Sequence, residues 1–237
     1  MHVPDGFLDA PVSVAAGAVA VAGIGVALRG ARRELDDRTA PLAGLTAAFV
    51  FAAQMINFPV ASGTSGHLLG GALAAILVGP YTGILCVSVV LLMQALLFAD
   101  GGLTALGVNI SVMALVTVLV GYGTFRLLLR VLPKTRASVA GSSFAAAVIS
   151  VPASAVAFTL LYAVGGTADV PIAKVATAMV GVHVLIGVGE ALITAVTVSS
   201  VLAVRPDLVH GAHDLIKPLE LRTAEPQAGG PAEPSRA

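Results

Sequence analysis

The chain has 237 residues, of which 57% are hydrophobic and only 11% are charged, and its mean hydropathy is +0.96. Soluble domains are about 45–50% apolar and about 25% charged, so a soluble globule of this size is excluded and lipid must cover part of the surface. Thirteen basic residues balance thirteen acidic ones, which excludes a global field that attracts nucleic acid. The single cysteine, Cys86, excludes an internal disulfide and a cysteine-rich metal cage. The composition predicts a polytopic membrane protein embedded in the lipid bilayer.

Seven apolar stretches follow one another along the chain and predict an all-α integral membrane protein with about seven transmembrane helices. They cover residues 10–28, 40–60, 68–78, 81–99, 103–125, 137–164 and 175–204. Most are near the ~20 residues that cross a bilayer. The third is short, and only the Gly79-Pro80 breaker separates it from the fourth.

The placement of basic residues supports this division. Twelve of the 13 lysines and arginines fall after the first, fifth and last stretches, and only Lys174 falls elsewhere. With seven spans these clusters share one face, so the positive-inside rule predicts an outer N-terminus and a cytoplasmic C-terminus in the cell (inner) membrane. Residues 1–204 then form one membrane domain, and the polar residues 205–237 are expected to be a disordered cytoplasmic tail.

The first two residues form an unusual chelating group. The Met1 amine, the His2 backbone nitrogen and His2 Nδ1 supply three nitrogens that close two adjacent chelate rings. A fourth nitrogen completes a square-planar site, which suits Ni(II) or Cu(II) and tolerates Co(II). His67 lies on the same predicted side of the membrane, at the end of a Gly-rich turn, and is the natural fourth ligand.

Four polar residues are candidates for supporting this metal-binding N-terminal segment, residues 1–9. Thr64 or Ser65 could hold the His67 imidazole in one tautomer, Asp100 could attract cations at the mouth, and Asn109 could brace the segment. The alternative is that His2 occurs by chance and that His67 merely caps the membrane interface.

Four segments together resemble the CbiM/NikM family, the substrate-capture membrane subunits of energy-coupling-factor (ECF) transporters for cobalt and nickel. They are MHVPDGFL at 1–8, NFP at 57–59, GTSGHL at 63–68 and QALLFADGG at 94–102, and the resemblance covers about residues 1–204. It implies a seven-helix fold in which Met1, His2 and His67 bind the metal. Co(II) or Ni(II) is then a transported ligand rather than a catalytic cofactor.

The resemblance also implies partners. These are an ECF coupling transmembrane protein, ATP-binding cassette ATPase subunits and a small accessory membrane protein, with a link to cobalamin biosynthesis. None of the chain's three lysines follows a glycine, so a Walker A motif is absent and the chain itself is not expected to be an enzyme. Small residues on the first stretch, at Ala16/Ala20 and Ala18/Ala22, resemble the docking face for the coupling protein. Ordinary helix packing explains the same spacing.

Two ionisable residues lie within the last stretch. His183 and Glu190 are seven residues apart and project from nearly one helix face. Such groups are costly in a membrane and suggest a proton or metal relay, but a buried polar network that locks the bundle is the preferred interpretation. His210 and His213 are interpreted as part of a solvated cytoplasmic end.

Two other functions compete with metal capture. A proton-coupled secondary transporter would use Glu190. An intramembrane serine protease would pair Ser65, within a G-x-S-G pattern, with His183, although this leaves Met1, His2 and His67 without a role.

Overall fold

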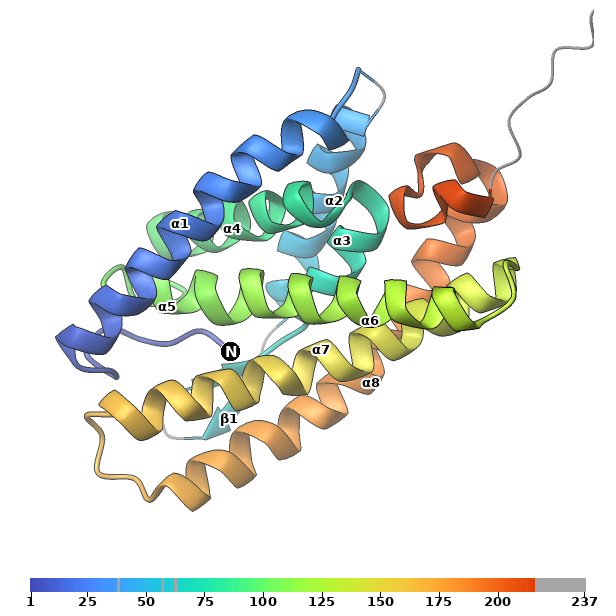
Figure 1. Ribbon diagram of the computed structural model, residues 1–237. Helices are drawn as coiled ribbons and strands as arrows, with labels where there is room; N and C mark the ends of the chain where they lie inside the picture. The colour runs from blue at the N-terminus through green and yellow to red at the C-terminus, as the bar shows by residue number, and fades with distance from the viewer. Residues whose placement is uncertain (38, 57, 62–63, 216–237) are drawn as a thin grey trace, which may run out of the picture.

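The computed structural model describes residues 1–37, 39–56, 58–61 and 64–215. Each of the seven predicted apolar stretches contains helix, and the helices pack side by side in one bundle (Figure 1). The helices are α1 (Ala10–Glu34), α2 (Thr39–Gln54), α3 (Gly71–Val78), α4 (Pro80–Leu97), α5 (Leu106–Asn109), the π-helix η1 (Ile110–Val116), α6 (Thr117–Val131), α7 (Arg136–Gly165) and α8 (Ile172–Val204). Two short 3₁₀ segments follow, η2 (Pro206–Leu208) and η3 (His210–Leu215).

Local sequence signals set several helix ends. Asp9 caps α1, because its side chain accepts a hydrogen bond from the Val12 backbone N–H at 2.9 Å. Thr135 caps α7 in the same way through Ser138. Arg32 and Arg33 lie in the last turn of α1, where positive charge complements the helix dipole.

Within the described residues, five helical segments are long and apolar enough to cross a membrane, and α2 is a sixth, shorter apolar helix. The unbroken stretch Leu106–Val131, which joins α5, η1 and α6, counts as one of the five. The sequence did not predict its π-helical turn. π-Helical turns are frequent at functional sites, and this one follows Asn109 directly.

The second predicted stretch ends earlier than expected. Helix α2 stops at Gln54, and β1 (Phe58–Ala61) then pairs antiparallel with β2 (Thr64–Gly66). The expectation of helix through residue 60 is therefore wrong. The physical reason is Pro59, which lacks a backbone N–H donor and restricts the residue before it to extended conformations.

The third stretch is helical only in its second half. Helix α3 has eight residues, all buried, and is about 12 Å long, well short of the ~30 Å hydrocarbon core. Residues 67–70 precede it without helical structure. Gly70 has φ +78°, which favours glycine. Helix α4 begins directly after Gly79, as the Gly79-Pro80 signal predicted.

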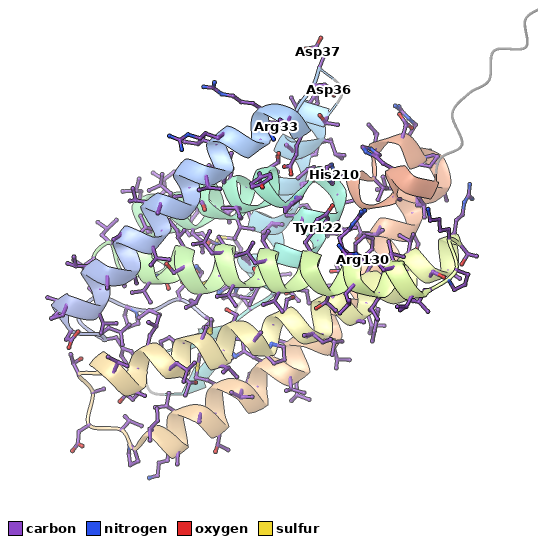
Figure 2. The ribbon with its side chains drawn as sticks, in the orientation of Figure 1. Arg33, Asp36, Asp37, Tyr122, Arg130 and His210 are labelled. Carbon is purple, nitrogen blue, oxygen red and sulfur yellow. The ribbon has the colours of Figure 1, made fainter. Side chains whose placement is uncertain are left out.

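Ordered structure continues past residue 204. Val209 and Ala212 are completely buried, and the segment packs against α3. Figure 2 shows His210 beside Tyr122 of α6, with a ring-centroid separation of 6.1 Å. The packed domain therefore extends beyond the predicted boundary at 204. The rest of the expected tail, residues 216–237, lies outside the described residues.

Close backbone contact between α1 and α5 gives a test of the packing. A side-chain carbon built on Gly107 would lie 2.4 Å from the Gly17 Cα atom, which is backbone and cannot move aside. We expect Gly107→Ala to lower the melting temperature in detergent by at least about 2 °C, because overpacking typically costs 1–3 kcal/mol and each kcal/mol shifts the melting temperature of a chain of this size by about 2–4 °C. Gly123→Ala is the matched control, since no described atom lies within 4 Å of its added carbon. Equal melting temperatures for the two variants would contradict this close approach.

Candidate metal centre

The amino terminus of the chain lies inside the bundle. The first residues run inward from the start of α1, and the terminus ends among the helices near β1 (Figure 1). Met1 is 1% exposed and Val3 is completely buried. The backbone of Val3 is held on both sides: its N–H donates to Asn109 Oδ1 at 2.8 Å, and its carbonyl accepts from Asn109 Nδ2 at 3.2 Å and from the Gly102 N–H at 2.9 Å.

The outer part of the segment is fastened to two loops. Asp5 Oδ1 accepts from the backbone N–H and the hydroxyl of Thr104, at 2.7 and 2.6 Å, and these hydrogen bonds lower the pKa of Asp5. The Thr167 hydroxyl donates to the Gly6 carbonyl, and the Asp9 N–H donates to the Gly165 carbonyl at 2.7 Å. The terminus is therefore fixed along its length.

His2 is buried, and each of its ring nitrogens lies close to a polar side chain. Its Nε2 lies 3.0 Å from Gln94 Oε1, and because an amide oxygen only accepts, Nε2 is the donor in this pair. Nδ1 lies 3.0 Å from Asp100 Oδ1. Nδ1 is the nitrogen that a chelate with the chain terminus requires, so a metal bound there would take the place of this contact with the carboxylate.

His67 presents its other ring nitrogen to the terminus. Its Nδ1 donates to the Leu68 carbonyl at 2.7 Å, which leaves the lone pair on Nε2. That Nε2 lies 2.5 Å from the Met1 amine nitrogen, and the rings of His2 and His67 stack with centroids 4.5 Å apart. Two residues 65 positions apart in sequence thus meet at the buried amine.

Burial also determines the protonation of these groups. It lowers the pKa of the Met1 amine from 8.0 to about 4, against a smaller opposing effect of Asp100. Burial likewise lowers the pKa of His67 well below 6.5, and the charges of the amino terminus and His2 lower it further. At neutral pH the amine and the His67 imidazole are therefore neutral, which is the state that binds transition metals.

The candidate donor atoms are all nitrogens. The described residues hold no cluster of three or more His, Cys, Asp and Glu side chains suited to a metal ion. Two of the candidate nitrogens, the Met1 amine and the His2 backbone nitrogen, belong to the main chain. An amine, a backbone amide and two imidazoles suit Ni(II) and Cu(II), and Co(II) less strictly.

Two of the four residues predicted to support the N-terminal segment lie in contact with it. Asp100 and Asn109 both contact the N-terminal segment. Thr64 and Ser65 lie in β2, and their side chains are outside the described part. Gln94, which the sequence predicted together with Asn109 as a helix-packing residue or a support for the N-terminal segment, contacts His2.

The two ionisable residues of α8, His183 and Glu190, bond to different parts of the chain. His183 donates from Nδ1 to the Met179 carbonyl at 2.7 Å, and its buried Nε2 makes no hydrogen bond to the described residues. Glu190 accepts hydrogen bonds from the backbone N–H groups of Leu69 and Gly70, at 2.6 and 3.0 Å. No sequence pattern links Glu190 to residues 120 positions earlier, so this contact could not be predicted.

Of the four small residues that were predicted on α1 as a docking face, two are buried and two are exposed. Ala16 and Ala20 are buried, and the Ala16 carbonyl accepts from the Ser111 hydroxyl at 2.9 Å. These two residues are therefore unavailable to a partner, because they already pack within the bundle. Ala18 and Ala22 are exposed, so the predicted docking face reduces to them.

The profile of the CbiM family, described as the cobalt uptake substrate-specific transmembrane region, matches residues 2–208. The chain belongs to the CbiM family. A cobalt transport protein CbiM of Sorangium cellulosum is 34% identical over 216 residues, covering 88% of this chain and 94% of that protein. A Haloquadratum walsbyi protein named for metal transport is 42% identical over 209 residues, covering 88% of this chain and 93% of that protein.

A solved structure agrees with the fold of this CbiM-family chain. A crystal structure of a truncated transition metal transporter superposes with a TM-score of 0.75 at 31% identity, covering 86% of this chain and 99% of that one. The family and its transport-protein relatives make this chain a cobalt/nickel transport membrane component.

The lowered pKa of the Met1 amine predicts a pH dependence for docking of the segment. The docked amine binds a proton only near pH 4, whereas a released amine binds one near pH 8. Docking is therefore strongest above pH 8 and weakens as the pH falls towards 4. We expect hydrogen exchange in peptides covering residues 1–9 of the metal-free protein to be faster at pH 5 than at pH 8, after correction for intrinsic rates. Peptides from the centre of α7 are the control. Equal protection of residues 1–9 at both values would contradict a neutral docked amine.

Proposed function

We propose that this CbiM-family protein is the metal-capture subunit of an importer for Co(II) or Ni(II). The observation that carries the proposal is the convergence of nitrogen atoms at the buried terminus. The Met1 amine and His67 Nε2 lie 2.5 Å apart, and the His2 ring stacks on the His67 ring. The backbone nitrogen of His2 lies between these groups in the chain and completes the set.

Capture in this proposal proceeds by exchange of protons for metal. The ion replaces the short contact between the amine and His67 Nε2, and the His2 amide loses its proton when its nitrogen binds. The nearby Asp100 carboxylate favours the approach of a cation. Asn109 holds Val3 on both sides, which fixes the chelating residues relative to His67.

The proposed ion is cobalt or nickel. A planar set of four nitrogens with a deprotonated amide favours Ni(II) over Co(II). Relatives carry both assignments by name, as a cobalt transport protein in Sorangium cellulosum and as a fused nickel transport protein, NikMN, in Rhodobacter capsulatus. We further propose a link to cobalamin biosynthesis, as the family resemblance implies.

The proposed energy source is ATP hydrolysis by partner subunits. We place the N-terminus outside the cell membrane and the C-terminus in the cytoplasm, with seven crossings, as the basic clusters predict. An ECF coupling protein with its ATPases would then reorient the loaded subunit, and a small accessory membrane protein would complete the complex. Both side-chain oxygens of Glu190 are held by backbone N–H groups, which favours a structural role over that of a proton carrier.

Removal of either histidine tests the capture site. We expect His67→Ala and His2→Ala each to weaken Ni(II) or Co(II) binding by more than about 100-fold, because loss of groups that only support a ligand already costs 10–100-fold. Calorimetric titration of the full chain in detergent measures this. His213→Ala is the matched control, an exposed histidine in the C-terminal segment. Native affinity in the His67→Ala variant would refute the proposed site.

The terminal amine has its own test. An added Gly-Ser-Gly-Ser sequence before Met1 converts the amine to an ordinary amide nitrogen and places bulk at a position that is 1% exposed. We expect metal binding to fall by more than about 100-fold, as for loss of a ligand. The same four residues added after Ala237 should leave binding unchanged. If both extended proteins bind metal equally, the amine is not a ligand.

A further inference from the structure

A buried carboxylate binds the backbone that directly follows His67. Glu190, in the middle of α8, is 2% exposed. Its Oε2 accepts from the Leu69 N–H at 2.6 Å, and its Oε1 accepts from the Gly70 N–H at 3.0 Å. These two N–H groups belong to residues 67–70, the non-helical backbone before α3.

The Leu69 N–H and the carbonyl that receives His67 Nδ1–H belong to one peptide group. The carbonyl of that planar unit is the Leu68 carbonyl, 2.7 Å from His67 Nδ1. In a trans peptide the C=O and the N–H point in opposite directions. Glu190 therefore holds one end of the group, and His67 is bound to the other.

We propose that Glu190 is a positioning residue that acts on the metal ligand His67 through this single peptide group. The inference rests on the proposed function, because it assigns Glu190 a part in that same site. The carboxylate fixes the plane of the 68–69 peptide, and so the direction in which the Leu68 carbonyl faces the imidazole. That carbonyl holds the tautomer whose lone pair is on Nε2, the atom beside the Met1 amine.

The arrangement also changes the strength of the ligand. Hydrogen bonds in series polarise one another, so a carboxylate on the N–H makes the carbonyl at the other end a better acceptor. A stronger acceptor on Nδ1–H raises the basicity of the opposite ring nitrogen, as it does for metal-bound histidines with direct carboxylate partners. Here a peptide group stands between the carboxylate and the ring.

A second side chain supports the same unit. The Gln54 Nε2 group, at the end of α2, donates to the Leu69 carbonyl at 2.7 Å. Both backbone polar groups of Leu69 are thus held by buried side chains from α8 and α2. Through Glu190, α8 sets the position of the fourth proposed nitrogen, while the N-terminal segment supplies the other three.

The chain offers a matched control for Glu190. Glu34, at the end of α1, accepts from the backbone N–H groups of Tyr81 and Thr82 at the start of α4, at 3.2 and 2.7 Å. The chemistry is the same: a glutamate on two successive amides at the start of a neighbouring helix. Glu34 contacts none of the proposed ligands or the residues that hold them in the described structure, so its loss removes a carboxylate clamp without affecting His67.

The experiment is a mutant cycle of Ni(II) binding by the full chain in detergent. We expect Glu190→Gln to weaken binding by about 10-fold or more, and Glu34→Gln to change it by less than about twofold. Because Glu190 acts through His67, Glu190→Gln should cause no further loss of binding when it is combined with His67→Ala. Glu190→Asp, which keeps the charge and withdraws the oxygens by one methylene, should also weaken binding if Glu190→Gln does not fold.

Each other outcome is decisive. Equal affinity for the Glu190→Gln, Glu34→Gln and native proteins overturns the inference, as does native affinity for Glu190→Asp. A loss that is undiminished in the His67→Ala background also overturns it, because Glu190 would then act on the fold and not on that ligand. Native affinity for His67→Ala itself refutes the proposed capture site instead, which separates the two failures.

Discussion

Burial of the chain's own amino terminus is the constraint on which the rest of the structure depends. An α-amine is normally charged and hydrated, and bringing it among helices is unfavourable unless it becomes neutral and finds a partner. Here burial lowers the pKa of the amine to about 4, and His67 Nε2 lies beside it. The Asn109 side chain and the loops that hold Asp5 and Gly6 keep the terminus in place.

The interrupted third segment follows from the same constraint. A continuous helix through residues 67–70 would place His67 on a regular helical face with its backbone groups used internally. The non-helical backbone instead brings the imidazole to the terminus and leaves peptide groups that require partners in an apolar interior. Gln54 and Glu190 satisfy the peptide groups of Leu69. Irregular backbone is tolerated here because protein, and not lipid, surrounds it.

Two glutamates do comparable structural work at separate places in the bundle. Glu34 accepts a hydrogen bond from the start of α4, and Glu190 accepts one from the backbone before α3. The two glutamates therefore hold the two ends of the short chain segment between His67 and Thr82. That segment contains the Gly79-Pro80 turn and a helix of only eight residues. Fixed at both ends, α3 is a rigid connection between the proposed metal site and the end of α1.

The sequence by itself determined the membrane class, the order of the apolar segments and the Gly79-Pro80 break, because composition and helix breakers are local properties. It also predicted Met1, His2 and His67 as candidate ligands, and the structure brings these three residues together. Only the tertiary structure decided that α2 ends at Gln54, that Ala16 and Ala20 face inward, and that residues 206–215 pack on the bundle. The contact of Glu190 with Leu69 spans 121 positions, and Gln94 reaches His2 over 92. Which side chain bonds to a buried polar group depends on which residues lie close together in the folded chain. No periodicity of the sequence indicates that closeness, so these hydrogen bonds could not be predicted.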